Sequence, residues 1–124
     1  MRLAALIPAV TGAAILLLAN AVPAHAGYGA IAYDQMTGSY GASSNEPTAA
    51  RAQEVALKNC GSPGCRAHTV EPHGCGALAK SASDKAWGGA DRDTLDAARR
   101  EAVEHCQTHT NTGQCNVVVT ACNR

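Results

Sequence analysis

Six cysteines and five histidines are the side chains of this 124-residue sequence that are best suited to metal or thiol chemistry. His105 and His109 are four residues apart, and His68 and His73 shortly precede Cys75, so a zinc site with cysteine and histidine ligands can be drawn. The helix expected around His105 ends one residue later, however, which removes the helical spacing between the two histidines. An even number of cysteines in a chain with an export signal also indicates disulfides, which leave no thiolate for a metal. We therefore expect no metal and no cofactor, and a metal-binding or thiol protein is the weakest interpretation.

Other reactive groups form no catalytic motif. No serine lies in a Gly-x-Ser-x-Gly turn, and every cysteine is expected to be paired, so no nucleophile is indicated. Asp91, Asp93 and Asp96 cluster, but at the amino end of an expected helix, where negative charge is stabilising. Gly88-Gly89 lacks the lysine and the second glycine of a phosphate-binding loop. We therefore expect no catalytic residue.

An internal repeat positions the cysteines. The segment 28–32 (YGAIA) matches 75–79 (CGALA) at an offset of 47 residues, and Tyr40-Gly41 matches Trp87-Gly88 at the same offset. At an offset of 46, four further residues correspond, namely Thr48, Ala52, Ala56 and Cys60 to Thr94, Ala98, Ala102 and Cys106. The segment 65–70 (CRAHTV) then corresponds to 115–120 (CNVVVT) after a four-residue insertion. These four sets of matching residues occur in the same order in both halves of the chain, which indicates a duplicated unit.

Each unit has the pattern of two strands, a helix and a third strand. The short alternating runs GAIAY and GALAK are typical of strands that are buried on one face, and the Tyr40 and Trp87 segments predict a second strand in each unit. The segments CRAHTV and CNVVVT predict the third strands. The sequence therefore predicts an α+β fold of two pseudo-symmetric β-β-α-β repeats, 27–74 and 75–124, with mainly antiparallel sheet, two helices and stabilising disulfides.

Helices are expected near 48–59 and 94–105. In both, two alanines and a cysteine are spaced by four residues and lie on one face, where their small size lets a sheet approach closely. Pro47 suits the start of the first helix, which Ser43-Ser44-Asn45 is expected to prepare, and Gly61 suits the position after its end. Asp93 is expected to cap the second helix.

The repeat also predicts the disulfides. Cys60 ends a helix and Cys65 begins the next strand, so we expect Cys60–Cys65, and the equivalent positions predict Cys106–Cys115. Cys75 and Cys122 remain, and we expect a Cys75–Cys122 bond that joins the two halves. This bond closes the longest loop and should therefore stabilise the fold most.

Two aromatic residues occupy equivalent places in the two units. Tyr40 and Trp87 are each followed by glycine, and they belong to a chain with no phenylalanine, three tyrosines and one tryptophan. We expect each to be the largest core residue of its half, because large aromatics dominate small cores. If Tyr40 and Trp87 are exposed instead, they form a pair of anchors for a binding surface.

The amino-terminal segment 1–26 has the features of a cleaved secretory signal peptide. Arg2 precedes an uncharged apolar run, and Ala24-His25-Ala26 presents small residues at the cleavage positions. The run is interrupted and short for a membrane span, so no stable membrane anchor is expected after cleavage. Basic and acidic residues number ten each, which argues against a nucleic-acid partner. The expected location is secreted, extracellular or in the cell envelope, and residues 27–124 are one domain.

The chain resembles a family of small exported bacterial proteins, the domain of unknown function number 4189. The resemblance rests on YGAIAY at 28–33, the alanine-rich helix ending at Cys60-Gly61, CGALA at 75–79, Trp87-Gly88-Gly89 and the final Ala121-Cys122-Asn123. It implies a secreted single-domain protein, in some bacteria associated with contact between microbe and host, and it implies no catalytic residues.

These observations favour a small, disulfide-stabilised binding or interaction module. Its expected partner is a protein or a component of the cell envelope or of a host. The alternative from another class is a small extracellular enzyme with an unrecognised site. A pocket with clustered ionisable groups would favour the enzyme, whereas a flat exposed patch around Trp87 or the 107–114 loop would favour binding.

Overall fold

Two β-β-α-β units follow one another in the computed structural model, which describes residues 27–124. The predicted signal peptide, 1–26, lies outside the described residues. The first unit consists of β1 (Tyr28–Tyr33), β2 (Tyr40–Glu46), α2 (Ala49–Cys60) and β3 (Arg66–Val70). The second consists of β4 (Cys75–Ser81), β5 (Trp87–Arg92), α3 (Leu95–Gln107) and β6 (Cys115–Cys122). The predicted α+β fold with a duplicated unit is confirmed.

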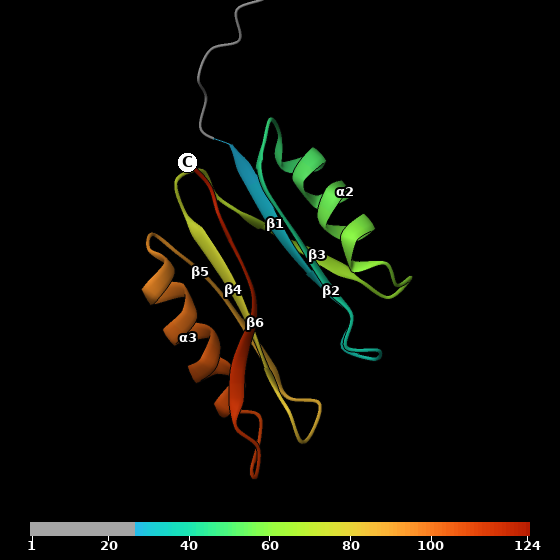
Figure 1. Cartoon of the computed structure of the whole chain (residues 1–124), viewed down its shortest axis with the longest axis vertical. Helices are drawn as coiled ribbons and strands as arrows, with labels where there is room; N and C mark the ends of the chain where they lie inside the picture. Colours follow the sequence, from blue (N-terminus) through green and yellow to red (C-terminus); the bar gives the residue numbers. More distant parts are fainter. Residues whose placement is uncertain (1–26) are drawn as a thin grey trace, which may run out of the picture.

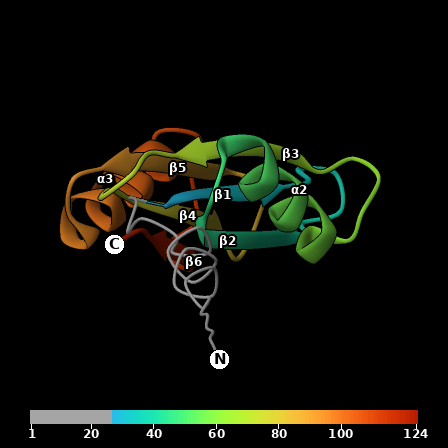
Figure 2. The same cartoon turned by 90° about the horizontal axis from the view of Figure 1, so that it is seen from above.

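The strands form two separate antiparallel sheets with equivalent orders, β2-β1-β3 and β5-β4-β6. The first strand of each unit is therefore the central strand of its own sheet. The two sheets lie face to face, with α2 covering the outer face of one and α3 the outer face of the other (Figure 1). Seen from above, β3 and β5 lie on one side of the molecule and β2 and β6 on the opposite side (Figure 2).

Alternation along the central strands separates the helix-facing core from the core between the sheets. In β1, Ala30 and Ala32 pack with α2, whereas Ile31 and Tyr33 face the second sheet. In β4, Ala77 likewise faces α3, and the large Leu78 side chain packs between the sheets. Since successive strand residues point to opposite faces, small residues alternate with large ones, and the helices lie close while the sheets are held apart.

Glycines at equivalent positions bring each helix against its sheet. A Cβ atom on Gly41 would lie 2.3 Å from the Cys60 backbone nitrogen, and one on Gly88 would lie 2.3 Å from that of Cys106. No larger residue fits at either place without moving the helix. The buried helical residues are those expected from the sequence, namely Ala52, Ala56 and Cys60 in α2 and Ala98, Ala102 and Cys106 in α3.

The helix starts differ from the prediction in two respects. The caps are Thr48 and Thr94, whose hydroxyls accept hydrogen bonds from Arg51 N and Ala97 N, so the expectation that Asp93 caps α3 is wrong. The segment 43–45 belongs to β2 rather than to a helix lead-in, because Ser43 pairs with Ala30 and Glu46 with Tyr28 of β1, on either side of a shift in register. Gly61 ends α2 in the left-handed conformation, at φ 75°, as its position predicts.

The three disulfides join Cys60 to Cys65, Cys106 to Cys115 and Cys75 to Cys122, which are the pairs that the repeat predicts. The first two bonds hold each helix end to the following strand. The third connects β4 with β6, which are neighbours in the second sheet. The expectation that Cys75–Cys122 joins the two halves is therefore wrong, because both residues belong to the second unit.

Asn123 joins the halves instead. Its buried side chain accepts a 2.9 Å hydrogen bond from Asn45 N in the first unit and donates to the carbonyl oxygens of Val70 and Glu71 at 3.0 and 2.9 Å. Asn45 Oδ1 in turn accepts from Arg124 N at 2.8 Å. This amide network fixes the end of β6 to the first sheet, next to the Cys75–Cys122 bond.

Neither α2 nor α3 is long and apolar enough to cross a membrane.

Candidate functional site

A cleft of about 470 Å³ lies between the two sheets, on the side where β3 and β5 form the edges. Its floor is apolar and comes from both units: Ile31 and Val70 from the first sheet, Leu78 and Gly76 from the second. These are inward-facing residues of the alternating strands, so the cleft is a direct continuation of the core between the sheets. Its volume is in the range of small-molecule binding sites.

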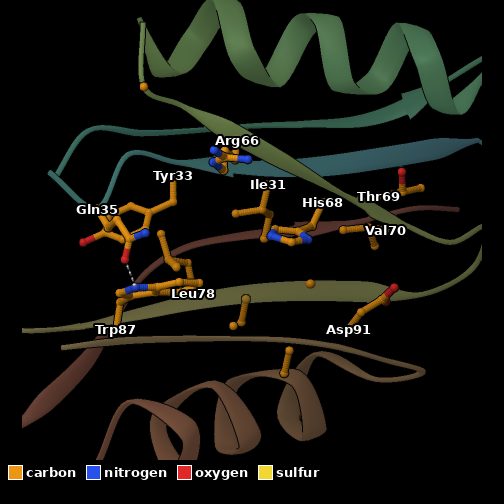
Figure 3. Close-up of a pocket in the computed structure, with 15 residues that line it drawn as sticks. Ile31, Tyr33, Gln35, Arg66, His68, Thr69, Val70, Leu78, Trp87 and Asp91 are labelled. Atoms are coloured by element: carbon orange, nitrogen blue, oxygen red, sulfur yellow. Dashed lines mark hydrogen bonds between the residues drawn. The ribbon is translucent and has the colours of Figure 1, made fainter. Parts of the chain in front are cut away.

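The walls carry the polar groups. Arg66 and His68 project from β3, whereas Trp87 and Asp91 project from β5 on the opposite side (Figure 3). Residues two apart on a strand share a face, so Arg66 and His68 point the same way, and Trp87, Gly89 and Asp91 do so on the other wall. The cleft therefore has a polar rim above an apolar floor.

Gly89 keeps the middle of the β5 wall free of side-chain atoms. A Cβ atom there would meet only the Ala77 carbonyl oxygen, at 3.6 Å, so the space in front of it is open. The neighbouring Gly88 faces α3 and has no such room. The two adjacent glycines thus have different roles: Gly88 allows the helix to approach, and Gly89 leaves space in the cleft.

Trp87 and Tyr33 close one end of the cleft. Their ring centroids are 5.3 Å apart with planes tilted by 54°, and Trp87 Nε1 donates a 3.2 Å hydrogen bond to Gln35 Oε1 (Figure 3). Arg66 belongs to the same end, because it pairs with Tyr33 across β1 and β3. This end therefore combines an aromatic surface with a guanidinium group.

Asp91 lies at the other end, where the backbone N–H of Glu71 hydrogen-bonds its carboxylate and no ion pair within residues 27–124 neutralises it. It pairs with Gly76, whose backbone is packed so closely against Val70 that a Cβ atom would lie 2.6 Å from Val70 Cγ2. Burial raises the pKa of the half-buried Asp91 carboxyl, since it disfavours the charged form. The adjacent Arg92 side chain turns away and pairs with Glu101.

Neither charged end of the cleft has an ionic partner within residues 27–124. The ion pairs there join Arg51 to Glu46 and Glu54, and Arg92 to Glu101. Arg66 and Asp91 are in none of them. A cation at one end and a half-buried carboxylate at the other are thus both available to a ligand.

The two aromatic residues predicted as core residues have different surroundings. Trp87 is half-buried and packs against the core between the sheets, but Tyr40 is 41% exposed. The expectation that Tyr40 is a core residue is therefore wrong. Its ring instead faces the Lys80 ammonium group, which lies 5.7 Å from the Tyr40 centroid and 5.5 Å from that of Tyr33. Of the suggested surface pair, Trp87 lines the cleft and Tyr40 does not.

The histidines of the possible zinc site do not converge. His105 is in α3 and its Nδ1 lies 2.9 Å from the Gly89 carbonyl oxygen, whereas His109 follows the end of that helix. His68 is on β3 and His73 is in the turn before β4. In the part of the chain that the structure describes, no three histidine, cysteine or acidic side chains form a group that could hold a metal ion.

Arg66, His68 and Asp91 are functional candidates that sequence reasoning did not single out as a group. Their alternation with Ala67 and Ala90 indicates that they share the inward face of their strands. Recognising that β3 and β5 then face one another requires the packing of two separate sheets, which no local pattern encodes.

The fold and the cleft define a class: a duplicated, disulfide-bonded α+β domain in which two helix-covered sheets enclose a ligand-sized space. Residues 28–122 match the family described as Domain of unknown function (DUF4189), and the chain belongs to that family. It is 43% identical over 76 residues to Protein Rv1269c of Mycobacterium tuberculosis and to Protein Mb1300c of Mycobacterium bovis. The aligned residues cover 61% of this chain and 58% of each relative.

A solved structure has a similar fold. The NMR structure of Rv1813c from Mycobacterium tuberculosis superimposes with a TM-score of 0.60 at 33% sequence identity, covering 84% of this chain and 81% of that one. The chain spans little more than half the length of the curated relatives that it matches.

Proposed function

We propose that this protein is exported and works as a binding module whose ligand occupies the cleft between the sheets. The observation that carries the proposal is the combination of an apolar floor with charged side chains on facing walls, Arg66 and Asp91, that form no ion pair within residues 27–124. Sites for small ligands typically have this composition: apolar surface supplies affinity, and a few polar groups fix orientation. The binding partner on the cell envelope or on a host would present such a ligand.

The disulfides suit this role. Cys60–Cys65 ties the end of α2 to the start of the wall strand β3, and Cys75–Cys122 joins the floor strand β4 to β6, so the site rests on a covalently braced scaffold. A preorganised cleft binds more tightly because less conformational freedom is lost on binding. Three disulfides in a chain with a secretory signature also fit an oxidising compartment.

A small extracellular enzyme is the second candidate, and the ionisable groups in the cleft favour it. His68 and Asp91 could serve as acid and base. Against this, none of the residues described as lining the cleft is a serine or a cysteine, and no hydrogen bond between His68 and Asp91 is present in residues 27–124. An enzyme would lose turnover in His68→Gln while retaining ligand affinity, whereas a binding module would show no turnover in either protein.

The binding proposal can be tested with anilinonaphthalene sulfonate, an aromatic anion that fluoresces in apolar sites. Trp87, the sole tryptophan, reports its arrival by energy transfer. We expect one dye per protein, and we expect Gly89→Leu to weaken binding at least tenfold by filling the cleft. Ser44→Leu, an equal-sized side chain on the exposed edge strand β2, is the matched control and should bind as the wild type does. Equal dye affinity in all three proteins would contradict the proposal.

Export has a separate test, the intact mass of the protein in culture medium. We expect a chain that starts at Gly27, lacks two hydrogens per disulfide and takes up no alkylating reagent. Free thiols or an uncleaved amino terminus would contradict this part of the proposal.

A further inference from the structure

We propose that the ligand of the cleft is a short, extended, apolar peptide with both ends free, its carboxylate bound at Arg66 and its ammonium group at Asp91. This inference rests on the proposed binding function and specifies the chemistry of the ligand. It is carried by three features of the cleft: its charges, their separation and its shape.

The charges have opposite sign at opposite ends. Arg66 lies beside Tyr33 and Trp87, whereas Asp91 lies beside Gly76 and Val70. Arginine binds carboxylates through two parallel hydrogen bonds, which makes it well suited to a peptide carboxyl terminus. Asp91 is half-buried without an ionic partner in residues 27–124, and a ligand cation would compensate the cost of its burial.

The distance between the two charged ends of the cleft fits an extended peptide of three to four residues. Trp87 and Asp91 are four residues apart on β5, which corresponds to about 13 Å along the strand. An extended chain spans at most roughly 3.3–3.6 Å per residue, so a tripeptide reaches about 10 Å and a tetrapeptide about 13 Å. The long Arg66 side chain can take up the difference for the shorter peptide.

The shape fits an apolar body between these ends. Ile31, Val70 and Leu78 form the floor along the whole interval, and Gly89 leaves space for a side chain at its middle. An acyl chain with one anionic head would satisfy Arg66 but leave Asp91 unpaired. A zwitterion with apolar side chains satisfies both ends and the floor.

β5 is poorly suited to capture a peptide as an added strand. The Gly89 carbonyl oxygen faces His105 Nδ1 at 2.9 Å, and the Asp91 carbonyl oxygen accepts from Arg92 Nη1 at 2.6 Å. With these two carbonyls occupied, recognition by side chains in the cleft is favoured over pairing with this edge.

The experiment titrates trileucine into the wild-type protein and follows Trp87 fluorescence and amide NMR shifts. The probes are the free tripeptide, its N-acetylated form and its C-amidated form. We expect the free peptide to bind at least fivefold more tightly than either blocked form. Asp91→Asn should abolish the preference over the acetylated form and leave the preference over the amide. Arg66→Gln should do the reverse.

This pattern separates the ligand class from the function of the cleft. Equal binding of all three peptides, or an unchanged preference in both variants, would overturn the peptide assignment. Suppose that trileucine does not bind, while the naphthalene dye binds the wild-type protein and binds Gly89→Leu more weakly. The peptide assignment then fails and the binding function of the cleft stands. Both variants change exposed or half-buried groups at the rim, and an unchanged thermal midpoint verifies that they are folded.

Discussion

The Trp87 ring packs on Tyr33 across the boundary between the two repeats, with centroids 5.3 Å apart. The repeat offset of 47 residues maps Tyr33 onto Lys80 and Trp87 onto Tyr40, and these two residues also contact each other, with the Lys80 ammonium 5.7 Å from the Tyr40 centroid. One packing arrangement therefore occurs twice, once as an aromatic pair and once as a cation–π pair. The aromatic copy lines the cleft and the charged copy does not, so the two halves have kept one geometry and diverged in chemistry.

The aromatic pair and the cation–π pair should contribute different amounts to the stability of the protein. Trp87→Ala removes a half-buried ring from the core between the sheets, and we expect a loss of about 2 kcal/mol in the free energy of unfolding. Tyr40→Ala removes a largely exposed ring and a cation–π contact, with an expected loss of about 1 kcal/mol or less. Urea unfolding followed by circular dichroism measures both values, and a larger loss in Tyr40→Ala would contradict this assignment.

An added methyl group should destabilise the protein at one of the two adjacent glycines of β5 and have little effect at the other. In Gly88→Ala the new Cβ would overlap the α3 backbone near Cys106, and overpacking of this kind costs about 1–3 kcal/mol. Gly89→Ala meets open space in the cleft and should change stability by less than about 0.5 kcal/mol. Gly41 is the residue equivalent to Gly88 in the first repeat, so Gly41→Ala should cause a similar loss of stability. Similar thermal midpoints for all three variants would show that the helices are not held as closely as described.

The disulfides should contribute according to the loops that they close. Removing Cys75–Cys122 with paired serines opens a loop with a sequence separation of 47, whereas removing Cys60–Cys65 opens one of 5. In a chain-entropy model these loops correspond to about 4 and about 2 kcal/mol. Equal unfolding midpoints of the two double variants would contradict this order.

Acid should weaken the fold through Asp34. This buried carboxylate accepts hydrogen bonds from Met36 N, Thr37 N and the Ser62 hydroxyl, and the Ser62 bond is the main reason that the pKa of Asp34 falls from 3.8 to about 2. Because the folded-state pKa is depressed, the stabilisation is complete above about pH 4 and is lost as the pH falls through about 2.

We therefore expect Asp34→Asn to melt at a lower temperature than the wild type at pH 6, with the gap closing toward pH 2. Ser62→Ala should reproduce part of the effect. A gap that is independent of pH would mean that the charge of Asp34 does not stabilise the fold.

The turn at Asp34 illustrates how much the repeat encodes. At the offset of 47, Ser81 takes its place, and the Ser81 hydroxyl accepts from Ser83 N and Asp84 N as Asp34 does from Met36 N and Thr37 N. The order of elements, the buried helix faces and the two short-range disulfides follow from such landmarks, because each depends on residues close together in the chain, and Cys75–Cys122 follows because these two cysteines remain.

Features that depend on distant residues could not be predicted from the sequence. Ser43 looks like a turn residue, yet it lies in β2, where it pairs with Ala30 of β1 and its hydroxyl donates to the Ala52 carbonyl oxygen of α2. No sequence pattern around Asn123 indicates that its side chain contacts Asn45 and Val70, which are distant in the chain. The cleft is the clearest case, since it exists only because the inward faces of β3 and β5 belong to two sheets that pack together.

The most direct test of binding in the cleft is a map of amide chemical shifts in isotope-labelled protein during titration with the naphthalene dye. We expect the largest changes on both walls and the floor, at Ile31, His68, Leu78, Gly89 and Asp91, and none at Ser44 or in the outer turns of α2. Changes confined to the exposed residues of the hairpin ends, or scattered over the helices, would contradict the claim that the space between the sheets is the binding site.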